Sequence, residues 1–202
     1  MKRSLILLLV IASTSSFFKV FSQEKGYSGS HVELGYAVEI TNKGNTLTGP
    51  QLFITPSYSL NNNTTIGVGA GVKLFRDADD KVVSAFPLYA NAMHRFNNTK
   101  ISPFIEGKLG YTLMNKTYDA KLTNYYPEYP GTVDVHSKRK GGLFFSPSFG
   151  AFFPIKSKQR FSVAIAYILD QQYIEAYAVQ INKTEKETRT YHSIALRLGY
   201  IF

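Results

Sequence analysis

The chain has 202 residues, which is enough for one ordinary domain, and it contains no cysteine. Without cysteine, neither a disulfide framework nor a thiolate metal site can form. The 23 Lys and Arg residues outnumber the 14 Asp and Glu residues, for a formal net charge of +9. The basic residues do not form the stripe that is typical of nucleic-acid binding, so we expect no nucleic-acid partner.

Residues 1–22 have the order of a secretory signal peptide. A basic start is followed by the apolar run from Leu5 to Ala12 and by residues suited to cleavage before Gln23. The alternative is a membrane anchor, but the run is shorter than the roughly 20 residues that a spanning helix needs. We therefore expect export and removal of this segment. Three positive charges leave with it, so the expected domain, residues 23–202, has a net charge of +6.

Eight segments of the remaining chain alternate between apolar and polar residues with a period of two, which is typical of strands. The clearest segment runs from His31 to Ile40, where every even-numbered residue is apolar and the odd-numbered residues are polar or small. A helix would spread these apolar residues around its surface. The expected strands are 31–40, 50–60, 65–76, 83–96, 101–115, 142–155, 160–170 and 190–202.

The connections between these strands alternate in length. Short polar turns are expected at 61–64, 97–100 and 156–159, and longer loops at 41–48, 77–81, 116–140 and 171–189. This asymmetry is typical of transmembrane barrels, and a sheet that spans lipid must close so that no edge is left unpaired. The predicted fold class is all-β, an eight-stranded antiparallel up-and-down transmembrane β-barrel. Its predicted location is the bacterial outer membrane, surrounded by outer-membrane lipid.

A secreted sandwich or a lipocalin-like barrel with its apolar face inside is the alternative fold. The opposite rows of each strand would then form the solvent-exposed surface. Those rows are rich in Gly, Ala and Ser, and they carry fewer charges than the roughly 25–35% of a soluble surface. The composition of these rows therefore favours the membrane barrel.

Four prolines within the expected strands count against the barrel, because proline cannot donate a hydrogen bond to a ladder. A closed barrel has no edge strand to accommodate them. We therefore expect bulges, strand ends or positions outside the membrane for Pro56, Pro87, Pro103 and Pro147.

The rows expected to face inward contain charges of both signs. These are Glu33, Glu39, Lys73, Arg95, Glu106, Lys108 and Arg197. Eight strands leave room inside for side chains only, and buried charges must be paired. We therefore expect a filled polar lumen with a structural charge network, and the alternative is a catalytic or conducting lumen. Arg197 is expected to meet Glu33 or Glu39 where the first and last strands close the barrel. Arg95 is expected to meet Glu106 across a hairpin.

Several short motifs recur along the chain and resemble a known family. They are Thr55-Pro56-Ser57-Tyr58, Ser102-Pro103-Phe104, Ser146-Pro147-Ser148-Phe149, the segment 105–111 and the final Leu198-Gly199-Tyr200-Ile201-Phe202. Together they resemble the outer-membrane β-barrel domain family of the OmpA/OmpX type, above all its Bacteroidetes-style members, which include the PorT-like group. The resemblance covers the whole mature chain. It implies that Tyr200 and Phe202 form a C-terminal signal for the barrel-assembly machinery, although Arg197 stands where the family usually has glycine.

Some small barrels of this architecture are lipid-modifying enzymes, which need a nucleophile beside a base. His192 and Ser193 are neighbours in the chain, but consecutive strand residues point to opposite faces. The other histidines, His31, His94 and His136, show no metal-ligand spacing. We therefore expect no catalytic residues, no cofactor and no metal.

The expected loop at 116–140 is the best candidate for a contact surface. It contains Tyr125, Tyr126 and Tyr129, followed by the basic residues Lys138, Arg139 and Lys140. Tyrosine rings give contact area at low entropic cost, and the basic residues are suited to anionic lipid headgroups. The alternative is a passive exposed loop.

The expected function is that of a non-enzymatic outer-membrane barrel that contributes to envelope structure and contacts a protein partner or lipid through its long loops. One alternative is a component of an outer-membrane secretion or transport machine, which the resemblance to the PorT-like group implies. The other is a lipid-modifying barrel enzyme.

Overall fold

The computed structural model describes residues 27–40, 48–76, 82–97, 99–123, 131–156 and 159–202. The predicted signal peptide lies outside these residues. No helix in the described part of the chain is long and apolar enough to cross a membrane. Within it the strands are β1 (Tyr27–Glu39), β2 (Gly49–Ser59), β3 (Thr64–Arg76), β4 (Val82–Arg95), β5 (Ser102–Leu113), β6 (Asn115–Thr123), β7 (Thr132–Lys156), β8 (Gln159–Ala178) and β9 (Lys183–Ile201).

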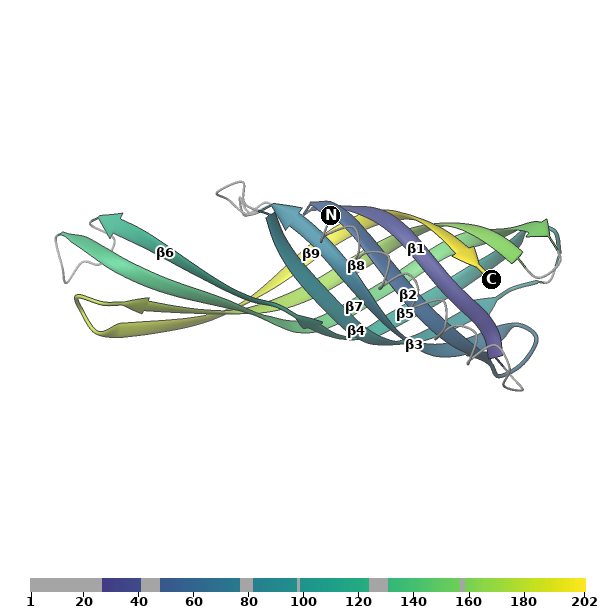
Figure 1. Ribbon diagram of the computed structural model, residues 1–202, viewed down its shortest axis with the longest axis horizontal. Helices are drawn as coiled ribbons and strands as arrows, with labels where there is room; N and C mark the ends of the chain where they lie inside the picture. Colours follow the sequence, from purple (N-terminus) through teal and green to yellow (C-terminus); the bar gives the residue numbers. More distant parts are fainter. Residues whose placement is uncertain (1–26, 41–47, 77–81, 98, 124–130, 157–158) are drawn as a thin grey trace, which may run out of the picture.

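All the described strands belong to one antiparallel sheet that closes on itself. Its order is β5-β4-β3-β2-β1-β9-β8-β7-β6, and β5 also pairs with β7. Eight strands therefore form a ring from which β6 alone is excluded, as Figure 1 shows. The predicted eight-stranded up-and-down barrel is confirmed.

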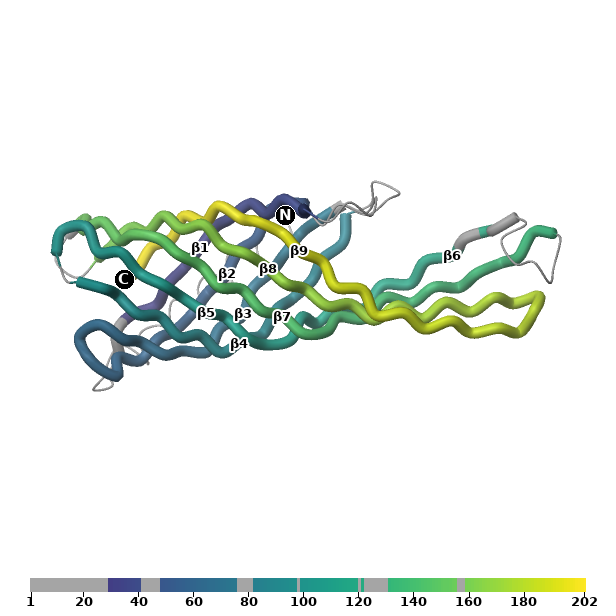
Figure 2. The backbone as a smooth tube through the Cα atoms, turned by 180° about the vertical axis from the view of Figure 1, so that it is seen from behind, coloured from purple at the N-terminus to yellow at the C-terminus, as the bar shows by residue number. Residues whose placement is uncertain are grey.

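Strands β6, β7, β8 and β9 continue beyond one end of the ring as a twisted sheet (Figures 1 and 2). β6 follows β5 after Met114 and pairs with the first residues of β7, up to the pair Asn115↔Lys140. β7 continues its pairing with β8, and β8 with β9. We call this sheet the extension; its segments are 115–123, 132–140, 171–178 and 183–190. The C-terminus lies at the opposite end of the barrel.

The prediction of loops at 116–140 and 171–189 is therefore largely wrong. Most of these residues form ladder hydrogen bonds in the extension, and residues 124–130 lie outside the described part. One reason is that polar residues occupy both faces of the Lys183–Arg189 part of β9. A strand without a single apolar row lacks the alternation that reveals strands in a sequence.

The two faces of the barrel wall differ as the alternation predicts. Outward residues are apolar and remain uncovered, such as Val68 at 68% exposure and Ile165 at 63%. Inward residues are buried whether they are polar or apolar, and the side chain of Lys108 is completely inaccessible. The outer surface therefore consists of large hydrophobic side chains that only an apolar medium covers favourably.

The prolines fit the closed ring in a way that only partly matches the expectation. Pro103 lies at the start of β5, as expected for a strand end. Around Pro56, Pro87 and Pro147 one of the two neighbouring ladders is interrupted without a register shift, while pairing with the other neighbour continues. The expected bulges are absent at these three prolines. Each proline instead leaves a gap on the side where it has no N–H to donate.

Two glycines of β5 give a matched test of how closely β5 packs against β4. A Cβ at Gly110 would collide with the backbone carbonyl of Leu88 on β4, whereas a Cβ at Gly107 would meet nothing within 4 Å. We expect Gly110→Ala to lower the free energy of unfolding by about 1–3 kcal/mol and Gly107→Ala to change it by less than about 0.5 kcal/mol. Urea unfolding of the refolded protein in lipid vesicles measures both. Equal midpoints for the two variants would contradict the described β4–β5 contact.

Candidate functional site

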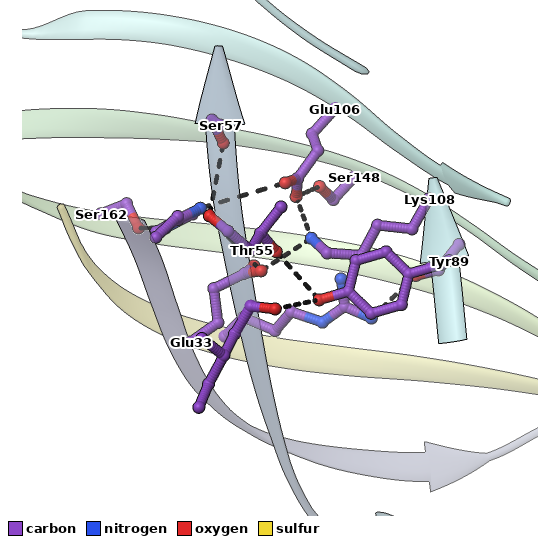
Figure 3. A network of polar contacts seen from close by, with 12 residues as sticks. Glu33, Thr55, Ser57, Tyr89, Glu106, Lys108, Ser148 and Ser162 are labelled. Carbon is purple, nitrogen blue, oxygen red and sulfur yellow. Dashed lines mark hydrogen bonds and ion pairs between the residues drawn. The ribbon is translucent and has the colours of Figure 1, made fainter. Parts of the chain in front are cut away.

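A buried charge cluster lies inside the barrel and is centred on Lys108 of β5. The Lys108 ammonium is 2.7 Å from Oε2 of Glu33 on β1 and 2.5 Å from Oε2 of Glu106 on its own strand. Figure 3 shows these side chains pointing toward one another. Glu106 and Lys108 are two residues apart, so both point inward. One cation is thus shared between two carboxylates, a set that carries one net negative charge.

Polar side chains from other strands surround this cluster. Ser148 of β7 donates a hydrogen bond to Glu106 at 3.1 Å, and His31 Nδ1 lies 3.9 Å from carboxylate oxygens of both Glu33 and Glu106. A further hydrogen bond of 2.9 Å joins the Thr55 hydroxyl and the Tyr89 hydroxyl. The cluster therefore connects strands on several sides of the ring.

His31 also forms a hydrogen bond of 3.0 Å through Nε2 with Ser162 of β8. A serine, a histidine and a carboxylate in this order resemble an acyl-transfer triad. However, 3.9 Å from His31 Nδ1 to either carboxylate is too long for the hydrogen bond that orients a catalytic histidine. Both His31 and Ser162 are also buried. The arrangement does not present a nucleophile to a substrate.

Three side chains of the buried charge cluster have the spacing of a metal site, which the sequence alone did not predict. One ligand atom each from His31, Glu33 and Glu106 lies within 4.8 Å of the others. The Lys108 ammonium contacts both carboxylates and so takes the place that a cation would occupy. His31 and Glu33 are two residues apart on β1, so the sequence predicts that both point inward. Glu106 comes from β5, and only the closed barrel brings it next to them.

A second ion pair lies nearer the extension. Lys73 of β3 pairs with Asp170 of β8, and Thr112 donates a hydrogen bond to the same carboxylate at 2.7 Å. The Lys73 ammonium also lies 5.1 Å from the centre of the Phe144 ring, which is within cation–π range. Asp170 was missing from the predicted network, although its position in the inward row of β8 would have indicated it.

Arg197 is buried as expected, and its described contacts differ from the predicted ones. It donates a hydrogen bond to Ser146 at 2.7 Å and stacks 4.6 Å from the centre of the Phe53 ring. Arg197 lies opposite Gly35 in the register of β1 and β9, while Lys108 contacts Glu33. Glu39 is half-buried at the end of β1, where its backbone N–H donates to Thr48.

The predicted pair of Arg95 and Glu106 does not form. In the register of β4 and β5, Arg95 lies opposite Phe104, whereas Glu106 lies opposite Met93. Arg95 is therefore two positions nearer the turn than Met93. Its guanidinium donates to the Asn62 carbonyl at 2.6 Å. Burial together with the nearby Arg160 lowers the Arg95 pKa below its ordinary value. Arg95 therefore belongs to the rim of the barrel and not to the lumen cluster.

Only the basic part of the predicted contact surface lies among the described residues. Tyr125, Tyr126 and Tyr129 lie outside the described residues. The basic residues lie in β7 and not in a loop. Lys138 and Lys140 are exposed on one face of the extension, while Arg139 on the other face lies 5.1 Å from the centre of the Tyr118 ring.

The proposed C-terminal signal lies at the far end of β9. The rings of Tyr200 and Phe202 are stacked with centroids 6.0 Å apart. Backbone hydrogen bonds between Phe202 and Ser30 hold the last residue against β1. The chain end is therefore part of the closed wall.

Comparisons with known proteins show the fold. No protein-family model matches the sequence, and no curated protein matches it. The structure is similar to Neisserial surface protein A, with 13% identity, a TM-score of 0.55 and coverage of 88% of this chain and 96% of that chain. It also matches AlkL (13% identity, TM-score 0.46, coverage 89% and 93%). A third match is the N-terminal barrel domain of Pseudomonas aeruginosa OprF (10% identity, TM-score 0.44, coverage 88% and 100%). The chain has the fold of small bacterial outer-membrane β-barrels.

The lumen cluster predicts a large effect of removing its central cation. Lys108→Met leaves Glu33 and Glu106 buried without the cation that contacts both of them, so we expect a loss of about 3–5 kcal/mol in unfolding free energy. The triple variant Glu33→Gln, Glu106→Gln, Lys108→Met removes all three charges and should recover most of that loss. Urea unfolding in lipid vesicles measures both variants. If Lys108→Met unfolds at the wild-type midpoint, the ion pairs do not hold the lumen together.

Proposed function

We propose that the protein is an integral, non-enzymatic outer-membrane barrel with a sealed lumen, which holds the extension beyond the membrane surface as a contact platform. The uncovered apolar outer rows support the membrane location, because leaving them in water would be very costly. Export with cleavage after residue 22 is part of the same proposal. The proposal includes membership of the Bacteroidetes-style, PorT-like group of outer-membrane barrels, which rests on the resemblance of the sequence motifs.

The lumen cluster is the observation that carries the proposal of a sealed lumen. Lys108, Glu33 and Arg197 are all about 1% exposed or less, and they extend from opposite sides of the ring into its centre. The rings of Phe53, Tyr89 and Phe144 pack with centroids about 6 Å apart beside these charges. Ion pairs and aromatic rings together occupy the cross-section through which a solute would have to pass.

The extension supports the proposed contact with an envelope or surface protein. Among the described residues, β6 pairs only with β7, and residues 183–190 of β9 pair only with β8, so both strands are edges. Both edges carry many charged residues, among them Lys121, Lys183 and Glu187. Charged edges discourage the addition of a foreign strand. The partner is therefore proposed to bind a face of the extension or its tip.

Biogenesis and surroundings complete the proposal. We assign Tyr200 and Phe202 to recognition by the barrel-assembly machinery, since both lie in the last strand and Phe202 is exposed. Outer-membrane lipid covers the outward rows. An enzymatic role is not part of the proposal, because His31 and Ser162 are both buried and the carboxylates of Glu33 and Glu106 lie 3.9 Å from His31 Nδ1.

Conductance tests the sealed lumen. The purified chain, inserted into planar bilayers, should give no stepwise conductance at moderate voltage, because the lumen charges are paired and the rings fill the space between them. A large porin measured under the same conditions serves as the positive control. Reproducible ohmic steps from the wild-type chain would contradict a sealed lumen.

A further inference from the structure

An open cavity of about 730 Å³ lies where the extension leaves the barrel. Its lining comes from β4 through β7 and includes Phe86, Tyr111 and Leu113 on the barrel side and Lys116, Lys138 and Lys140 on the extension side. The cavity is therefore lined by apolar side chains on the barrel side and by lysine ammonium groups on the extension side.

Local backbone geometry produces this hollow. Met114 separates β5 from β6, and the register of β7 with β8 shifts between Gly141 and Phe144. A Cβ at Gly141 would collide with the Thr112 carbonyl, so only glycine allows this close approach. The hydroxyl of Tyr111 donates to the Gly141 carbonyl at 2.7 Å and holds the bend in place. The cavity is thus a fixed feature of the junction.

The apolar wall continues the lipid-facing surface of the barrel. Phe86, Tyr111 and Leu113 are each about half exposed in the outward rows of β4 and β5. The extension above them carries polar outward residues such as Asn115 and Thr117. The cavity therefore lies at the level where the hydrocarbon region ends and the polar headgroups begin.

The lysines leave an excess of positive charge beside the cavity. Lys138 forms no ion pair among the described residues. Lys140 lies 3.5 Å from Glu175, which Lys186 contacts as well, at 3.6 Å. These two lysines, Lys186 first and then Lys140, lower the Glu175 pKa below its ordinary value. The Glu175 carboxylate thus contacts Lys140 and Lys186, and Lys138 is its partner in the register of β7 and β8.

We propose that this junction cavity binds an anionic lipid of the surrounding leaflet, with the lipid phosphate on Lys138 and Lys140 and an acyl chain along Phe86 and Leu113. An apolar wall below and ammonium groups above are together complementary to such an amphiphile, whereas a soluble anion would contact the ammonium groups alone. Lysines at the membrane surface attract anionic lipid with about 1 kcal/mol each. The inference rests on the proposed membrane location, and it gives the extension a role in anchoring the barrel at one leaflet.

Lipid binding to the full chain in neutral detergent tests the proposal. The probe is phosphatidic acid, and the matching diacylglycerol, which lacks the phosphate, is the comparison. Native mass spectrometry counts the bound lipid. We expect the double variant Lys138→Gln, Lys140→Gln to weaken phosphatidic acid binding about fivefold or more and to leave diacylglycerol binding unchanged.

A matched control separates the site from general charge. The variant Lys121→Gln, Lys183→Gln removes two exposed lysines of the extension that do not line the cavity, and it should bind phosphatidic acid within about twofold of wild type. Equal losses in both double variants would overturn the proposal, as would equal binding of diacylglycerol. Effective competition by glycerol 3-phosphate, which has no acyl chain, would show a simple anion patch and would also overturn it. Both variants should remain non-conducting in planar bilayers, so a failure of lipid binding is distinguishable from a failure of the sealed barrel.

Discussion

The structure depends on one constraint: a wall that is apolar on its outer face must place the charged side chains of the spanning strands inside. A lone charge there would be very costly. Lys108 meets this constraint by sharing its ammonium group between Glu33 and Glu106. Because these residues come from β1 and β5, on different sides of the ring, the same contacts that pair these charges also join opposite walls. The stability of the barrel and the proposed closure of its lumen therefore have a common origin.

The rest of the molecule follows from filling this interior. Large rings such as Phe53 and Tyr89 need space, and the glycines at 69 and 71 provide it, since a Cβ at either position would collide with one of these rings. Pro56, Pro87 and Pro147 lie where one ladder is interrupted, and Pro103 lies where β5 begins. Beyond the membrane the constraint no longer applies, and four strands continue with more polar residues, as in the Lys183–Arg189 part of β9. The cavity with its lysines lies at the level where the membrane-spanning wall ends and the extension begins.

The alternation of apolar and polar residues was sufficient to predict the barrel, its strand number and the inward position of Lys108 and Arg197. It could not predict which charges meet, because partners across a lumen are distant in sequence. His31 and Ser162, for example, are 131 positions apart. The extension could not be predicted for a different reason, because a strand segment that is polar on both faces, such as Lys183–Arg189, resembles a loop. Asp170 lies in the inward row of β8, so its position in the lumen was predictable from the alternation.

The buried, charged state of Lys108 is the central claim, and its side-chain nitrogen can be observed directly. In the ¹⁵N-labelled chain refolded in micelles near neutral pH, the account predicts one ammonium signal whose protons exchange slowly with water and which disappears in Lys108→Met. Exposed lysines such as Lys121 should exchange too fast to be observed. If the Lys108 ammonium exchanges as fast as that of Lys121, the lumen is open to water and the account is wrong.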